Sequence, residues 1–252
     1  MYEVEITFLI QLIEPKYHRM LLLTCTLFAL CGCLSKVVGA PEPCCVPAQW
    51  EANMDQLIGE SLPPPTGDLQ ITQDGHIWFD APHNRVALKI MQEVRVAGQT
   101  IKQDVIVLQD YDTKTQTTIL PAQKKCTTKP TATVKIHQCL NETNPTFVKA
   151  LNLGGSLDAY MWKSKVDNDQ QHLEVTLTIS QDSCLPIANV YSGTVESKGE
   201  QIPIQGSMLY FDITPGLKDT GIFKIPSYCT ESSSIGNEDI AFQGERSPGL
   251  LF

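Results

Sequence analysis

The sequence predicts an all-β protein in which two antiparallel sheets form a single sandwich or open barrel. Three observations favour this fold class. Apolar residues recur at every second position, turn residues separate about ten such runs, and an even number of cysteines follows an apolar leader. A mature chain of roughly 210 residues suits one large β domain better than two small ones.

The clearest alternation covers residues 172–179, where apolar and polar side chains take turns. This pattern is typical of a strand with one buried and one wet face. The apolar residues of this and similar runs are Leu173, Val175, Leu177 and Ile179; Val86, Leu88 and Ile90; Val134 and Ile136; and Leu209, Phe211 and Ile213. Val105–Leu108 is apolar on both faces, which indicates a strand in the middle of a sheet.

Turn residues separate these runs, and helix signals are few. Turns are expected at Asp74-Gly75, Ala97-Gly98, Lys129-Pro130, Gly154-Gly155 and Pro215-Gly216. No amphipathic helix stands out in the sequence, and Trp50–Gly59 is the one candidate for a short helix.

Residues 1–40 are expected to be an N-terminal extension and a signal peptide. Met20–Leu34 is uncharged and apolar, and it follows the basic pair His18-Arg19. Because a membrane span needs about 20 apolar residues, no transmembrane anchor is expected. Translation starts at Met1 or at Met20. Residues 41–229 then form the β domain, and residues 230–252, rich in Ser, Gly and Glu, a flexible tail.

Loss of the leader leaves six cysteines. An even number in an exported chain predicts a disulfide framework, made here from Cys44, Cys45, Cys126, Cys139, Cys184 and Cys229. The sequon Asn141-Glu142-Thr143 predicts N-glycosylation of Asn141. Together these features predict a secreted glycoprotein.

Composition and motifs argue against several function classes. A net charge of −9 disfavours nucleic acid as a partner, because phosphate contacts need clustered Lys and Arg. Asp219-Thr220-Gly221 matches the triplet of aspartic proteases, but those enzymes pair two triplets, so a surface turn is expected here. The histidines lack metalloprotease spacing, and no Gly-x-Ser-x-Gly motif is present. No catalytic residue and no enzymatic activity are predicted.

Acidic side chains offer a candidate calcium site. Asp110 and Asp112 flank Tyr111, with Asp80 or Asp104 as further oxygen donors. The sequence has no twelve-residue calcium loop. Ca²⁺ is therefore the one cofactor to consider, and the alternative is a pair of solvated carboxylates at a strand end.

Several segments, in order from Cys44 to Cys229, are together similar to the ependymin-related family. The matching segments are Cys44–Glu51, Tyr111-Asp112 with Cys126–Lys129, Leu153–Gly155 with Trp162, Cys184–Pro186, and Phe211-Asp212 with Gly221–Cys229. The doubled cysteine resembles the family's invertebrate branch. Residues 216–220 depart from the family's Gly-Ile-x-Asp-Pro turn.

The resemblance implies two stacked antiparallel sheets that form a half-open barrel with an apolar pocket. It also implies a homodimer, N-glycosylation and no enzymatic activity. By analogy Cys126 pairs with Cys229, and Cys44 and Cys45 each pair with one of Cys139 and Cys184; Cys45–Cys184 is the expected choice. Some relatives bind calcium or lie in extracellular matrices, including mineralised ones, and some are lysosomal.

The leading hypothesis is a secreted protein that binds a fatty acid or other lipid between its sheets. The expected pocket residues come from the alternating faces: Ile77, Phe79, Val86, Leu88, Val105, Val107, Val175, Leu177, Leu209 and Phe211. The alternative is a calcium-dependent protein of the extracellular matrix. Secretion to the extracellular space is expected, with the lysosomal lumen as the alternative location.

Overall fold

The computed structural model describes residues 40–64, 67–130, 136–168, 171–197 and 199–229. The chain divides into two compact units, Met1–Pro41 and Glu42–Phe252, and only the second is considered below. The expected signal peptide, residue Val134 and the expected C-terminal tail lie outside the described residues. No helix in the described ranges has the length and apolar character needed to cross a membrane.

One antiparallel sheet of 11 strands makes up the fold. Its first six strands are β1 (Gln49–Ser61), β2 (Asp68–Asp80), β3 (Arg85–Val96), β4 (Gln99–Asp110), β5 (Thr115–Leu120) and β6 (Lys125–Pro130). The other five are β7 (Thr146–Leu153), β8 (Leu157–Asn168), β9 (Gln171–Ser180), β10 (Pro186–Ser197) and β11 (Glu200–Pro215).

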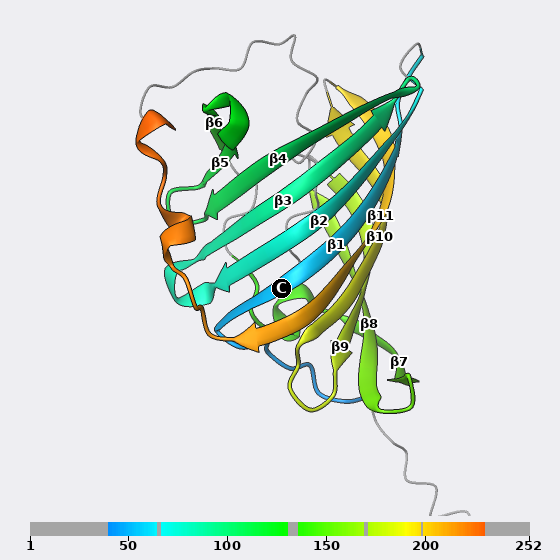
Figure 1. Cartoon of the computed structure of the whole chain (residues 1–252). Helices are drawn as coiled ribbons and strands as arrows, with labels where there is room; N and C mark the ends of the chain where they lie inside the picture. The colour runs from blue at the N-terminus through cyan, green and yellow to red at the C-terminus, as the bar shows by residue number, and fades with distance from the viewer. Residues whose placement is uncertain (1–39, 65–66, 131–135, 169–170, 198, 230–252) are drawn as a thin grey trace, which may run out of the picture. The chain divides into compact units, whose positions relative to one another are not determined.

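The strand order is β6-β5-β4-β3-β2-β1-β11-β10-β9-β8-β7. Strands β1–β6 and strands β7–β11 are two meanders, and the pairing of β1 with β11 joins them (Figure 1). The all-β class and the disulfides are confirmed. The expectation of two separate sheets is wrong, because this ladder continues from one meander into the other. The sheet is not closed, since β6 and β7 are its two edges.

Strand β1 replaces the short helix expected over Trp50–Gly59. Its even-numbered residues from Trp50 to Glu60 are buried, and it pairs with β2 on one side and β11 on the other. The alternation was hidden because polar Gln56 occupies an inward position and apolar Leu57 an outward one. The turn expected at Asp74-Gly75 is also wrong. Gly75 lies within β2, where a Cβ atom would overlap the Lys89 carbonyl oxygen of β3.

The inner face of the sheet carries the main hydrophobic core. In β9, for example, Leu173, Val175, Leu177 and Ile179 are at most 3% exposed. Trp50 of β1 is fully buried and stacks on Phe79 of β2, with 5.3 Å between the ring centroids. The described residues provide no helical layer over this face, so the bend of the sheet itself supplies much of its cover.

A smaller cluster lies on the outer face and is covered by residues 216–229, which we call the C-terminal strap. Ile222 and Phe223 of the strap pack against Ala87, Leu108, Ile119 and Cys126. The Arg85 guanidinium lies 4.0 Å from the centroid of the Phe223 ring. This cover explains why residues 105–108 are apolar on both faces, although β4 is third from the edge of the sheet.

Candidate functional site

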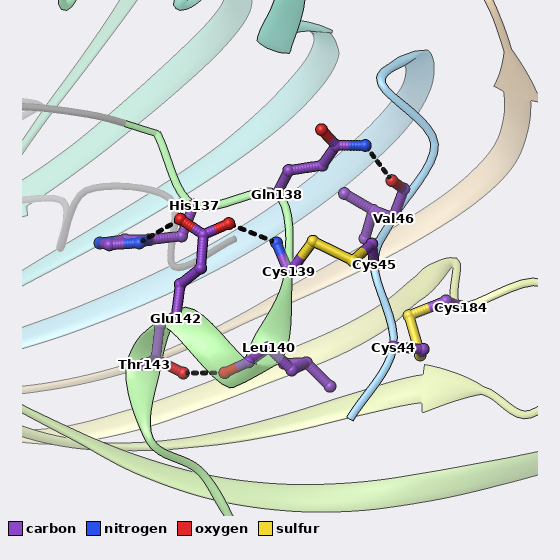
Figure 2. Close-up of a disulfide and its surroundings, with 10 residues drawn as sticks. All are labelled: Cys44, Cys45, Val46, His137, Gln138, Cys139, Leu140, Glu142, Thr143 and Cys184. Atoms are coloured by element: carbon purple, nitrogen blue, oxygen red, sulfur yellow. Dashed lines mark hydrogen bonds and ion pairs between the residues drawn. A yellow bond between two sulfur atoms is a disulfide. The ribbon is translucent and has the colours of Figure 1, made fainter. Parts of the chain in front are cut away.

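A short two-stranded ribbon, which we call the clamp, consists of Cys44–Val46 and Gln138–Leu140 (Figure 2). The Val46 N–H donates to the Gln138 carbonyl over 2.9 Å, and the Leu140 N–H donates to the Cys44 carbonyl over 3.0 Å. The Gln138 side-chain amide donates to the Val46 carbonyl over 2.9 Å. Val46 and Leu140 are buried in the main core, so the clamp is packed against the sheet.

Two disulfides fix the clamp. Cys45 pairs with Cys139 inside the ribbon, and Cys44 pairs with Cys184 in the turn between β9 and β10 (Figure 2). The expected Cys45–Cys184 pair is therefore wrong, since the two neighbours have exchanged partners. Cys45 lies opposite Cys139 in the ribbon, and this register selects its partner.

The clamp also reaches the other meander. The Ile136 N–H, just before the ribbon, donates to Asn84 Oδ1 in the turn between β2 and β3 over 3.1 Å. Cys44 is bonded to the β9–β10 turn at the same time. The clamp therefore links a turn of the first meander to a turn of the second, at one end of the sheet.

Asp80 organises the β2–β3 turn. Its carboxylate is fully buried and accepts hydrogen bonds from Gln49 Nε2 at 2.8 Å, His83 Nδ1 at 2.9 Å and Arg85 Nε at 2.8 Å. Burial alone would raise the pKa of Asp80. The hydrogen bonds and the Arg85 charge outweigh burial, so the pKa is lowered. Asp80 is thus a structural carboxylate with its oxygens occupied.

The expected pocket residues separate into two groups. Ile77, Phe79, Val86, Val105, Val107, Val175 and Leu177 are buried on the inner face, and Leu88 is half-buried there. Leu209 and Phe211 point outward, with 52% and 43% of their surface exposed. In β11 the inward residues are Met208 and Tyr210 instead. The structure thus brings eight of the ten residues to one face and places two on the other.

A groove of about 810 Å³ lies over one end of β1, β2, β10 and β11. Its accessible lining comes from outward side chains such as Leu57 and Val190, which are 45% and 54% exposed. The inward side chains of the same stretch, such as Ile58 and Ile204, are at most 3% exposed. The groove therefore opens on the outer face, and none of the ten expected pocket residues lines it.

A polar row crosses the otherwise apolar inner face, and sequence reasoning missed it. Paired positions on consecutive strands carry Gln103 of β4, Gln92 of β3, Gln73 of β2 and Gln56 of β1. The row continues through Met208, Asn189, Leu177 and Trp162 on β11, β10, β9 and β8. We call Gln103, Gln92, Gln73, Gln56, Asn189 and Trp162 the polar belt. The signal that marks it is a glutamine at an inward position of four successive strands.

The candidate calcium ligands have other partners. Asp110 Oδ1 accepts the backbone N–H groups of Asp112 and Thr113 at 3.0 and 2.9 Å, and so shapes the turn after β4. Asp112 Oδ1 accepts a hydrogen bond from Asn84 Nδ2 at 2.9 Å. Within the described ranges, no group of three or more His, Cys, Asp or Glu side chains is placed to hold a metal ion.

Comparison with known proteins shows which family this chain resembles. The ependymin family model matches residues 99–229, from the start of β4 to the last cysteine of the strap. The chain belongs to the ependymin family. Over 211 residues it is 25% identical to ependymin-related protein 2 of Haliotis asinina, covering 79% of this chain and 96% of that protein. Over 61 residues it is 38% identical to ependymin-related protein 1 of the same species, covering 24% and 29%.

Among solved structures, this ependymin-family chain matches a DUF1329 family protein from Desulfovibrio piger. The TM-score is 0.34 at 8% identity, over 71% of this chain and 90% of that one. Within the ependymin match, Cys126 is bonded to Cys229, as the family resemblance implies. The sequon residue Asn141 is exposed in the 3₁₀ turn Leu140–Thr143, directly after the clamp.

Proposed function

We propose that this ependymin-family protein is a secreted, non-enzymatic glycoprotein that binds a fatty acid or other lipid against the inner face of its sheet. The observation that carries the proposal is an apolar inner face on a sheet whose two edges, β6 and β7, are not paired with each other. The β1–β11 ladder and, at one end of the sheet, the clamp hold the two meanders together, and away from the clamp the β6 and β7 edges can separate without breaking ladder hydrogen bonds. A hydrocarbon chain would then replace apolar contacts between the meanders with contacts of its own.

The expected gain is sufficient for binding. Each buried CH₂ contributes about 0.8 kcal/mol. A sixteen-carbon chain therefore gains roughly 12 kcal/mol, against association costs of roughly 4–15 kcal/mol. At the low end of this cost the difference is about 8 kcal/mol, which corresponds to micromolar affinity. The exposed Asn141, available for a glycan, and the disulfides support passage through the secretory pathway, and the proposed destination is the extracellular space.

Titration of the delipidated protein with a fluorescent fatty acid is expected to give saturable binding below about 100 μM. Leu88→Ala, on the inner face, should weaken binding about fivefold, because it removes apolar contact area. The matched control is Leu209→Ala on the outer face, which should leave the affinity unchanged. Absence of saturable binding would refute the proposal, and sensitivity to Leu209→Ala alone would move the ligand to the outer face of the sheet.

The alternative, a calcium-dependent matrix protein, is tested separately. Because Asp110 and Asp112 already accept hydrogen bonds from the chain, calorimetry with Ca²⁺ should give the same titration for the wild type and for the Asp110→Asn/Asp112→Asn variant. A binding heat present only in the wild type would favour the calcium function.

Sedimentation in the same buffers tests the proposed homodimer, for which the exposed Leu57, Val190 and Leu209 offer apolar contact surface.

A further inference from the structure

The polar belt is buried more completely than ordinary amide side chains are. Gln92 is fully buried, Gln56 and Gln73 are 3% exposed, and Asn189 is 7% exposed. Amides are usually found at the surface, because burial without hydrogen bonds costs about 1–3 kcal/mol for each group. Several amides at one level of an apolar face therefore require partners.

The belt satisfies only part of this requirement internally. Gln73 Nε2 donates to Gln92 Oε1 over 3.1 Å, and Gln56 Nε2 donates to the Tyr191 hydroxyl over 3.1 Å. Asn189 Nδ2 donates to the Tyr210 hydroxyl over 3.2 Å. These bonds connect the glutamines of β2 and β3 to each other, the glutamine of β1 to β10, and Asn189 of β10 to β11.

Three polar atoms of the belt have no hydrogen-bond partner among the described residues. They are Gln92 Nε2 and Trp162 Nε1, which are donors, and Asn189 Oδ1, which is an acceptor. All three side chains belong to the same cross-strand row and are more than nine-tenths buried. The inner face therefore offers unmatched donors on β3 and β8 and an unmatched acceptor on β10, all in one cross-strand row, to the polar group of a ligand.

Among the described residues, the inward rows on either side of the belt in β1–β4, β10 and β11 hold no Lys or Arg side chain. The flanking inward rows of β1–β4 hold Ile58, Ile71, Val94 and Ile101 on one side, and Met54, Gly75, Ile90 and Val105 on the other. The titratable groups of those rows on β10 and β11 are the hydroxyls of Tyr191 and Tyr210, and burial raises the pKa of both. The nearest acidic side chain on the inner face of β1 is the buried carboxyl group of Glu60, which follows Ile58 along that face. A carboxylate held at the belt would face no counter-ion, which is costly for a buried charge.

We infer that the polar belt recognises the uncharged polar group of an amphiphilic lipid, such as a hydroxyl or an amide, and disfavours a free carboxylate. This inference rests on the proposed function, and it narrows the ligand from lipids in general to neutral lipids with a hydrogen-bonding group. The apolar rows on both sides of the belt take the hydrocarbon portion.

Displacement of a fluorescent lipid by three probes with the same sixteen-carbon chain tests the inference. At pH 8, 1-hexadecanol should displace it at a concentration at least tenfold lower than palmitate or hexadecane. Gln92→Leu and Asn189→Leu should each remove the preference for the alcohol over the alkane. The control is Gln201→Leu, which also replaces a glutamine by leucine but on the outer face of β11. It should leave the preference for the alcohol intact.

The outcomes separate the two proposals. Equal displacement by the three probes, or a preference for palmitate, would overturn the role of the belt while leaving lipid binding in place. Equal displacement would mean that the belt is satisfied by internal water. Failure of every probe, and of the fluorescent lipid itself, would refute lipid binding as well. The ranking of the probes on the wild type needs no variant, so it stands even where a substitution prevents folding.

Discussion

Replacement of Cys126 and Cys229 by alanine is expected to lower the free energy of unfolding by about 4–5 kcal/mol. The bond closes a loop with a sequence separation of 103 residues, and the chain-entropy model gives about 4.7 kcal/mol for a loop of that size. Since domains are stable by only about 5–15 kcal/mol, the variant should be close to unfolding at body temperature. Urea denaturation followed by circular dichroism measures the change.

The matched control is the Cys45→Ala/Cys139→Ala variant. Its sequence separation of 94 residues predicts a similar loss of stability from the unfolded chain. The two variants should differ in the native state. Only loss of the Cys126–Cys229 bond releases the end of the C-terminal strap, so only that variant should expose the cluster beneath Phe223 to a hydrophobic dye. A stability loss below about 1 kcal/mol would contradict the entropic account.

Asp80→Asn is expected to destabilise the protein by about 3 kcal/mol near pH 7, because it removes the charge that Arg85 faces and places amide donors against other donors. Asp182→Asn, in the exposed β9–β10 turn, is the control and should change stability by less than about 0.5 kcal/mol. Thermal melts of the three proteins over a range of pH measure the difference.

The sign of the pH effect follows from the direction of the pKa shift. The pKa of Asp80 is lower in the folded protein, so its contribution is fully present above the unfolded value of about 3.9. The contribution is lost as the pH falls through the folded value. The gap between wild type and Asp80→Asn should therefore persist as the pH falls to about 4 and shrink below that value. A gap that is unchanged at pH 3 would show that shape, rather than charge, sets the cost.

Strand alternation predicted some faces correctly and failed on others for a physical reason. In β9 apolar residues alternate with His172, Glu174 and other polar residues, and the structure buries the apolar set. In β11 residues 208–211 are all apolar or aromatic, so periodicity does not distinguish the two faces. The Tyr210 hydroxyl finds a partner in Asn189 inside the sheet, whereas Phe211 lies outside.

Strand order was beyond the reach of the sequence. Alternation describes the faces of one strand, and it contains no information about which strand lies beside it. The pairing of β1 with β11 therefore could not be predicted, and neither could the alignment of the four belt glutamines, which depends on register between strands. The prediction of which of Cys44 and Cys45 bonds to Cys139 fails for the same reason. Both neighbours lie at nearly the same place in the chain, and only the register of the clamp decides which of them faces Cys139.

The position of β1 beside β11 has a consequence for biosynthesis. The ribosome synthesises β1 first and its partner β11 last. One edge of β1 therefore stays unpaired and partly apolar during most of translation. Binding by a chaperone during translation would protect such an edge from pairing with other chains. A messenger RNA truncated before codon 200 would give a chain that lacks β11, the strand between β1 and β10. Such a chain cannot form the continuous sheet and should be degraded.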